Sequence, residues 1–306
     1  MERKDSMDLQ GAAGMVAFAV ALAFNQVVIK LTNGGFGPVF GAGLRSALAL
    51  CVLGLWLLVM RRTLGPLRMS LKSGLLMGTL FGVEFIFLFK ALDLTSVSRA
   101  SIVFYSMPVW LALLAHFTLP GERLSARRAL GLALAMAGVG WALANPDSRA
   151  GGNLTGDFMA LLACWCWAGI ALTVRLGRVS RMPAEGQLFW QLSVSSVILL
   201  GAAPLMGPLL RAPDAISWAA MGYGVLVASL GFLFWLRLMA IYPASDIASF
   251  SFLSPVLAVV FGWLVFGEPV GAQFVLALGL VAVGIVLINK RKRAGKLPPS
   301  TEGQGA

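Results

Sequence analysis

Charge is scarce in this sequence. Of its 306 residues, 12% are Asp, Glu, Lys or Arg, whereas 58% are hydrophobic, and the mean hydropathy is +0.85. A soluble domain cannot bury so many apolar side chains, because its surface needs polar ones. No stretch of the chain is polar enough and long enough to form such a domain. The composition therefore predicts an integral membrane protein.

Residues that build metal and catalytic sites are also few. The chain has one histidine, His116, and three cysteines, Cys51, Cys164 and Cys166, all within apolar runs. Cys164 and Cys166 would point about 200° apart around a helix, which argues against a disulfide or a metal site. No Walker motif, paired-histidine motif or Ser-His-Asp set is apparent. We expect no metal, no cofactor and no enzymatic activity.

Acidic residues are fewer than basic ones, 13 against 24, which gives a net charge of +11. In a soluble protein this excess would suggest nucleic acid as a partner. Here the basic residues stand in loops between apolar runs, where orientation in a membrane explains them. We expect no nucleic-acid binding.

Long apolar runs fill the chain almost from end to end. A run of about twenty residues crosses about 30 Å of hydrocarbon as a helix. Ten such runs lie at about residues 11–32, 36–60, 70–92, 97–119, 125–145, 155–177, 186–207, 215–239, 246–266 and 271–289. The predicted fold is an all-α polytopic membrane protein with ten transmembrane helices.

The basic residues lie mostly on one side of these spans. With the N-terminus inside, the cytoplasmic side holds Arg61, Arg62 and the run from Lys290 to Lys296, among others. The opposite side keeps Lys30, Lys90, Arg99, Arg149 and Arg211. This positive-inside pattern predicts a multi-pass protein of the cell (inner) membrane with both termini cytoplasmic. The Lys290 to Lys296 cluster is expected to contact anionic lipid.

One stretch of the chain occurs twice. Lys90 to Gly138 contains Ser-Met-Pro108, Gly-Glu122 and a glycine-bearing apolar helix, and Arg237 to Gly284 contains Leu-Ser-Pro255, Gly-Glu268 and a similar helix. Each copy belongs to a set of five spans, so the second set must enter the membrane from the opposite face. Two inverted five-helix repeats (5+5) are an architecture of secondary transporters.

The repeats divide the chain. We predict a first repeat at 1–145, a linker at 146–155, a second repeat at 156–289, and a basic, then disordered, cytoplasmic tail at 290–306. In this topology Gly121-Glu122 and Gly267-Glu268 fall at opposite membrane faces. Each Glu is expected to stabilise the start of the helix that follows it, through the helix dipole.

The repeated order of a small-residue segment, Ser-x-Pro or Leu-Ser-Pro, Gly-Glu and a glycine-bearing helix resembles the EamA-type repeat of the drug/metabolite transporter superfamily. Gly37, Pro38 and Arg45 resemble the second helix of that family's first repeat, whereas the second half has Trp190 or Gln191 near the corresponding place. The resemblance implies ten helices, transport of amino acids and other small metabolites, and a central cavity. That cavity would be lined by the first, third, fourth, sixth, eighth and ninth helices.

Two opposite charges lie at equal depth on consecutive spans. Arg45 and Glu84 are each about seven or eight residues from the outer end, roughly 10–12 Å into the membrane. A lone charge at such depth costs at least about 2.5 kcal/mol, so each needs a partner or an aqueous cavity. They form an ion pair that fixes two helices, or they bind charged groups of a substrate, or Glu84 carries a proton.

Prolines occupy matching places inside the fourth and ninth spans. Pro108 and Pro255 lack an N–H and clash with the carbonyl four residues earlier, which would free the carbonyls of Phe104 and Ser251. Paired helix breaks are a sequence indicator of a transporter site, with a kink for packing as the alternative. We expect these prolines to act in gating or as helix breaks.

Aromatic and polar side chains complete the predicted cavity. Trp165 and Trp167 point about 200° apart, so a single cavity can receive only one of them. Of the aromatic residues we favour Tyr105, Trp165 and Phe250. Their polar partners are Asn25, Ser101, Gln191 and Ser251. Such a lining suits an amphipathic solute of amino-acid size.

The sequence therefore predicts a secondary active transporter that exports amino acids or related small metabolites by alternating access. A nucleobase, a riboflavin-like vitamin or a nucleotide sugar is the alternative cargo, and a non-transporting receptor or membrane enzyme is the alternative class. Coupling to a proton gradient stays open. The expected partners are a small-molecule substrate and the bilayer, and the expected state is a monomer or a weak homodimer.

Overall fold

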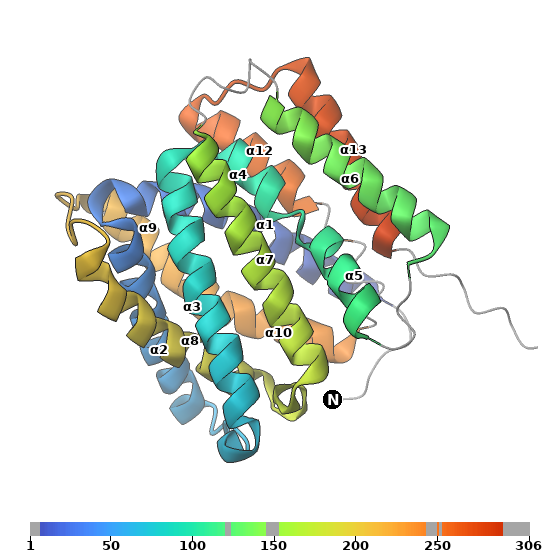
Figure 1. Ribbon diagram of the computed structural model, residues 1–306. Helices are drawn as coiled ribbons and strands as arrows, with labels where there is room; N and C mark the ends of the chain where they lie inside the picture. The colour runs from blue at the N-terminus through green and yellow to red at the C-terminus, as the bar shows by residue number, and fades with distance from the viewer. Residues whose placement is uncertain (1–6, 120–123, 145–152, 243–249, 251–252, 290–306) are drawn as a thin grey trace, which may run out of the picture.

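The protein is a bundle of membrane-length helices (Figure 1). The computed structural model describes residues 7–119, 124–144, 153–242, 250 and 253–289. Within these residues there is no β-sheet, and the pairing of Phe36 with Leu210 is an isolated bridge. Residues 146–152 of the predicted linker at 146–155, the tail from residue 290 and Ser251 lie outside the described residues.

The helices of the first half match the predicted spans closely. They are α1 (Leu9–Gly35), α2 (Pro38–Val59), α3 (Leu71–Leu94), α4 (Val97–Phe104), α5 (Met107–Thr118) and α6 (Ala126–Ala144). Their ends follow local chemistry: Asp8 caps α1 by accepting from the Gly11 N–H at 2.8 Å, and Pro38 stands in the first turn of α2. Proline is suited to that turn because its missing N–H would have had no helical partner there.

The second half repeats this order. Its helices are α7 (Leu154–Leu176), α8 (Ala184–Ala202), α9 (Ala215–Leu226), α10 (Phe232–Ile241), α12 (Leu253–Phe266) and α13 (Ala272–Asn289). In the described residues, seven helical segments are long and apolar enough to cross a membrane. With α6, α12 and α13 they make the ten predicted spans.

The fourth span is interrupted at the predicted place. Helix α4 ends at Phe104, and α5 begins at Met107 with Pro108 in its first turn. The Ser106 hydroxyl donates to the Val103 carbonyl at 2.6 Å, which satisfies one of the carbonyls at the end of α4. In the ninth span, Pro255 lies in the first turn of α12.

The eighth span contains a feature that the sequence analysis did not predict. Between α9 and α10 the backbone forms a π-helical turn, η5 (Val227–Gly231), and the Ser229 hydroxyl donates to the Val225 carbonyl at 2.6 Å. The turn packs against α2, the helix that carries Arg45. Such π turns are often found at functional sites.

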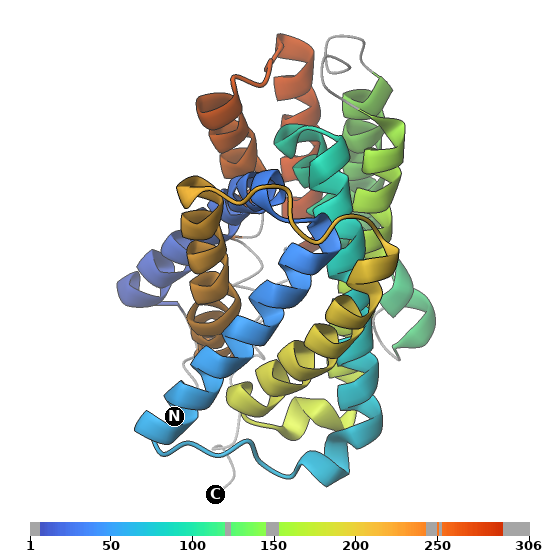
Figure 2. The same ribbon diagram turned by 90° about the vertical axis from the view of Figure 1, so that its left-hand side faces the viewer.

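The two halves pack symmetrically. Helix α2 packs on α8, α4 on α12, and α6 on α13, so each of these spans contacts its own counterpart (Figures 1 and 2). A Cβ on Gly284 would lie 2.5 Å from the Gly131 carbonyl oxygen, and one on Gly138 would lie 2.6 Å from that of Ala277. In the sequence repeat, Gly138 corresponds to Gly284 and Gly131 corresponds to Ala277. The contact of Gly284 with Gly131 is therefore the symmetry counterpart of the contact of Gly138 with Ala277.

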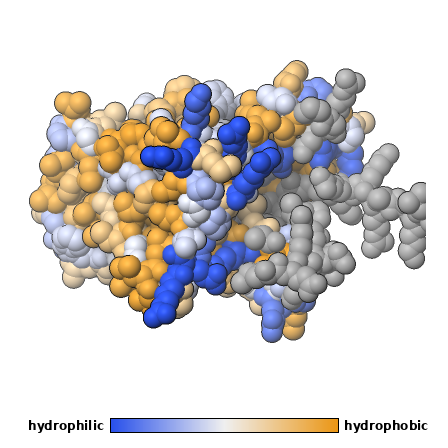
Figure 3. Space-filling model, turned by 90° about the horizontal axis from the view of Figure 1, so that it is seen from below, coloured by the Kyte–Doolittle hydropathy of each residue, from blue (hydrophilic) through white to orange (hydrophobic). Residues whose placement is uncertain are grey.

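Glycines also join the halves elsewhere. Gly74, Gly78 and Gly82 follow one face of α3, and a Cβ on Gly78 would lie 2.4 Å from the Trp190 carbonyl oxygen of α8. Glycines spaced four residues apart on one face thus let α8 approach α3 closely. The face of the molecule seen in Figure 3 is largely hydrophobic, with hydrophilic residues among the hydrophobic ones.

Candidate functional site

Arg45 is buried inside the bundle. It lies on α2 and is 3% exposed, and its guanidinium carbon sits 3.9 Å from the centre of the Phe85 ring and 5.1 Å from that of Phe89. Its stem passes Gly224 of α9, where a Cβ would lie 3.4 Å from Cδ. The Nε and Nη2 groups have no hydrogen-bond partner within the part of the chain that the structure describes. Aromatic faces thus hold the cation while two of its nitrogens remain available.

Glu84 is equally enclosed. It lies on α3 and is 4% exposed, and its Oε2 atom has no hydrogen-bond partner in the described ranges of the chain. Among the described residues no direct ion pair joins Glu84 to Arg45. The ion pair that would fix α2 to α3 is therefore not formed in this structure.

The other predicted polar residues share this property. Asn25, Ser101 and Gln191 are buried. Among the residues that the structure describes, nothing forms a hydrogen bond with Oδ1 of Asn25, Oγ of Ser101 or Oε1 of Gln191. A buried polar group left unpaired costs about 1–3 kcal/mol, so most proteins contain few of them. These atoms are polar groups of the interior that a ligand or water could pair with.

Three aromatic rings meet at the break in the fourth span. Phe104 stacks on Trp167 of α7 with ring centres 4.8 Å apart, and Tyr105 meets both rings edge-on at 5.5 and 6.1 Å. The Tyr105 hydroxyl donates to the Leu22 carbonyl at 3.2 Å and accepts from the Gln26 amide at 3.3 Å. The break therefore places a rigid aromatic cluster against α1.

The preference for Trp165 over Trp167 is corrected by this arrangement. Trp165 is 41% exposed and packs on Trp110 at the perimeter, with ring centres 5.2 Å apart. Residues two apart on a helix face nearly opposite ways, so only Trp167 reaches Phe104 and Tyr105. We replace Trp165 by Trp167 in the candidate set.

Phe250 lies apart from these residues. It packs against a separate apolar cluster formed by Met15, Leu238 and Tyr242. The structure therefore does not bring it beside Phe104 or Tyr105, and Ser251 falls outside the described residues. Gln26 was missed by the sequence analysis, although a glutamine in the middle of an apolar run next to Asn25 was a usable signal.

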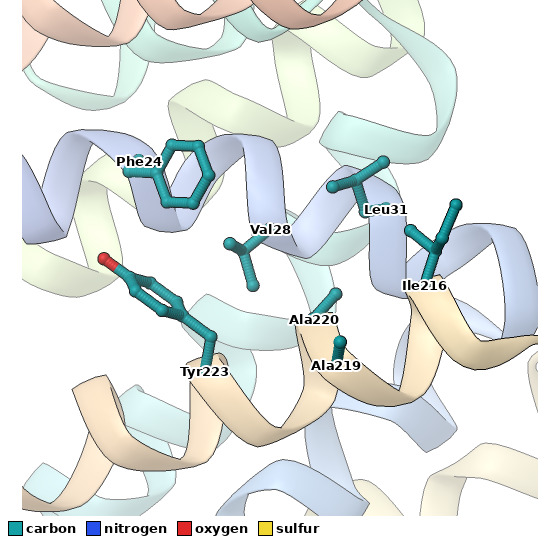
Figure 4. Close-up of a pocket in the computed structure, with 7 residues that line it drawn as sticks. All are labelled: Phe24, Val28, Leu31, Ile216, Ala219, Ala220 and Tyr223. Atoms are coloured by element: carbon teal, nitrogen blue, oxygen red, sulfur yellow. The ribbon is translucent and has the colours of Figure 1, made fainter.

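A groove of about 210 Å³ opens between α1 and α9 (Figure 4). Its lining is almost wholly apolar: Phe24, Val28, Leu31, Ile216, Ala219, Ala220 and Tyr223. Phe24 and Tyr223 meet edge-on at one end, and the Tyr223 hydroxyl donates to the Ala21 carbonyl at 3.2 Å. The predicted site residues do not line it.

The role expected for Glu268 is also corrected. Its carboxylate does not stabilise the start of α13, the helix that follows it. Instead it accepts from the backbone N–H groups of Val97 and Ser98, at 2.7 and 2.9 Å, in the first turn of α4. Glu268 therefore does stabilise the start of a helix, but this helix is α4 of the first repeat and not α13. Glu122 lies outside the described residues.

Ionic contacts at the surface are of a different kind. Arg211, in the loop before α9, pairs with Asp93 at 2.6 Å, and the hydrogen bonds that its guanidinium donates to the Asp93 carboxylate raise the pKa of Arg211 above its usual value. Among the described residues no group of three His, Cys, Asp or Glu side chains could hold a metal ion.

Comparisons with known proteins agree with this architecture. The sequence profile of the EamA-like transporter family matches residues 9–144 and again residues 154–290. A solved crystal structure superposes with a TM-score of 0.67 over 91% of this chain and 97% of that chain, at 19% identity, which supports the fold.

Named relatives are transporters. “Uncharacterized transporter YoaV” of Bacillus subtilis (strain 168) is 24% identical over 90% of this chain and 94% of its own length. “Probable amino-acid metabolite efflux pump” of Escherichia coli (strain K12) is 29% identical over 94% and 95%. “Uncharacterized inner membrane transporter YedA” of the same strain is 26% identical over 87% and 86%. With both halves matched, and with seven segments of the described residues long and apolar enough to cross a membrane, this chain is an inner membrane transporter and belongs to the EamA-like transporter family.

Proposed function

We propose that this transporter exports zwitterionic amino acids or closely related metabolites by alternating access between its two repeats. The observation that carries the proposal is the pair of enclosed, incompletely paired ionic groups on adjacent helices, Arg45 and Glu84. Two charges kept inside a membrane protein without a direct ion pair favour a ligand that completes them.

The chemistry of the two groups defines the class of ligand. A guanidinium with free N–H groups binds a carboxylate, and a carboxylate binds an ammonium group through a charge-assisted hydrogen bond. Asn25, Ser101 and Gln191 would supply neutral hydrogen-bonding groups. The Phe104, Tyr105 and Trp167 cluster offers aromatic faces for an apolar side chain.

The direction of transport rests on the relative named as an efflux pump and on the orientation indicated by the charges. With both termini cytoplasmic, the ends of α1 and α3 and the start of α9 face outward. Repeats at 1–145 and 156–289 would rock against each other, with Pro108 and Pro255 as breaks in the moving helices.

We expect no cofactor and no enzymatic activity. We also expect contact of the 290–296 cluster with anionic lipid, and a monomer or weak homodimer.

Purified protein in liposomes tests the proposal. We expect exchange of external for preloaded radiolabelled amino acids, measured over a panel that also includes a nucleobase, riboflavin and a nucleotide sugar, with and without a pH gradient. N-acetylated and carboxyl-amidated forms of the best substrate should compete poorly, since each lacks one charge. Equal competition by both blocked forms, or exchange of uncharged solutes alone, would overturn the proposal.

A further inference from the structure

One end of the bundle carries a dense set of contacts between the halves. At this end α1 and α3 finish and α4, α7 and α9 begin. Lys30 pairs with Glu268, Arg99 with Asp157, and Asp93 with Arg211. In each pair one residue belongs to the first repeat and the other to the second. The charge distribution assigns this end to the outside.

The Gly-Glu motif explains how Glu268 reaches the other repeat. Gly267 has a φ of +63°, and its N–H donates to the Trp263 carbonyl at 2.9 Å, which ends α12 in a left-handed turn. This turn sends Glu268 back along α12 toward Gly262. A Cβ on Gly262 would lie only 2.6 Å from Glu268 Oε2, so a glycine is needed there for the carboxylate to pass.

The carboxylate then closes the first turn of α4. It accepts from the N–H groups of Val97 and Ser98 and from the Ser98 hydroxyl at 2.6 Å, and Lys30 Nζ lies 3.6 Å from it. The first N–H groups of a helix have no partner within the helix, and the helix dipole favours a negative charge there. Glu268 is 7% exposed, so water screens these contacts little.

Neighbouring contacts reinforce the closure. Arg99, on the same short helix, forms a buried bidentate pair with Asp157 at the start of α7, and Thr95 donates to Asp157 at 3.0 Å. The turn between α1 and α2 pairs its backbone with the loop before α9: the Gly37 N–H donates to the Leu209 carbonyl at 2.9 Å. Opening this end therefore requires α4 to leave partners in the second repeat.

We infer that Glu268 is the latch of an outer gate, and that release of α4 from Glu268 opens the central site to the outside. This inference rests on the proposed function, since only a transporter needs such a gate. The test of the latch measures access to a buried position and uses no substrate. The latch can therefore be contradicted while the transport proposal stands, and the transport proposal can be contradicted while the latch stands.

The reporter is Ser101→Cys in α4, on a background without Cys51, Cys164 and Cys166, because Ser101 is fully buried beneath the latch. In right-side-out vesicles we expect slow labelling by a membrane-impermeant maleimide. Adding Glu268→Ala should raise the labelling rate at least about tenfold, as expected from loss of a charge-assisted hydrogen bond. Gly262→Ala keeps the carboxylate but displaces it, and should act in the same direction.

Glu185→Gln is the matched control. Glu185 pairs with Arg237, and the two side chains are 7% and 28% exposed, the same values as for Glu268 and Lys30. However, both belong to the second repeat and lie at the opposite end, so this change should leave labelling from outside unaltered. Unchanged labelling in both Glu268→Ala and Gly262→Ala would overturn the latch, as would an equal rise in Glu185→Gln. If Glu268→Ala does not fold, as judged by size-exclusion chromatography, Gly262→Ala and Ser98→Ala carry the test.

Discussion

The guanidinium of Arg45 lies 3.9 Å from the centre of the Phe85 ring, and no carboxylate completes it by a direct ion pair among the described residues. A planar cation can stack on a ring and keep its N–H groups free at the edge, whereas an ammonium group cannot do both. The site thus depends on arginine specifically and not only on a positive charge.

Arg45→Lys should therefore raise the KM for exchange at least about tenfold, and Arg45→Ala should abolish exchange. Arg45→Lys keeps the buried positive charge, so this change should leave the melting temperature in detergent nearly unchanged. Exchange assays and thermal unfolding, measured on the same preparations, distinguish a role of Arg45 in substrate binding from a structural role. A fall in melting temperature with normal KM in Arg45→Lys would assign Arg45 a structural role.

Trp167→Ala and Trp165→Ala form a second test, with two tryptophans on one helix. Trp167 stacks on Phe104, whereas Trp165 is 41% exposed. An aromatic pair contributes about 0.5–1.5 kcal/mol beyond its buried area, so loss of Trp167 should weaken binding of substrates with apolar side chains several-fold. Competition assays should show this loss for Trp167→Ala and near-normal binding for Trp165→Ala. Equal effects of the two substitutions would contradict the assignment of Trp167, and not Trp165, to the substrate site.

The helical spans and their repeat were predictable from the sequence, whereas side-chain directions were not. Runs of apolar residues set span lengths because a helix must cross a fixed thickness. A transmembrane helix, however, is apolar both where it meets lipid and where it packs, so its rotation is not encoded in hydropathy. That is why Trp165 was preferred to Trp167.

Contacts between the repeats could not be predicted from the sequence, for another reason. Glu268 was expected to act on its own following helix, because local rules consider neighbours in the chain. Its actual partners, Val97 and Ser98, are about 170 residues away. The π turn at Val227–Gly231 likewise packs against α2, a contact that no local sequence pattern specifies.

Gly78→Ala tests the packing of α3 on α8. A Cβ there would lie 2.4 Å from the Trp190 carbonyl oxygen, a backbone atom that cannot move alone. Overpacking of this kind costs about 1–3 kcal/mol and should lower the melting temperature by several degrees. Gly54→Ala is the control, since a Cβ on Gly54 meets nothing within 4 Å. A Gly78→Ala protein as stable as Gly54→Ala would contradict the close approach.

The orientation can be tested with two exposed positions on the cysteine-free background. Leu205, which is 88% exposed, follows α8, and Thr63 lies in the exposed loop before α3. We expect an impermeant maleimide to label Leu205→Cys in intact cells and to label Thr63→Cys only after the membrane is permeabilised. The reverse pattern would place both termini outside and turn the proposed outer gate into an inner one.

Glu84→Gln tests how the site responds to pH. If the Glu84 carboxylate binds the ammonium group of a substrate, its protonation removes the attracting charge, so wild-type exchange should fall as the pH is lowered. Glutamine cannot titrate in this range, so exchange by Glu84→Gln should be weak and nearly independent of pH. Exchange rates measured from pH 5 to pH 8 with equal pH on both sides check this.

The control is Glu185→Gln, at a carboxylate already paired with Arg237, which should keep the wild-type pH profile. A wild-type profile in Glu84→Gln would place the titrating group elsewhere and exclude Glu84 as a proton carrier.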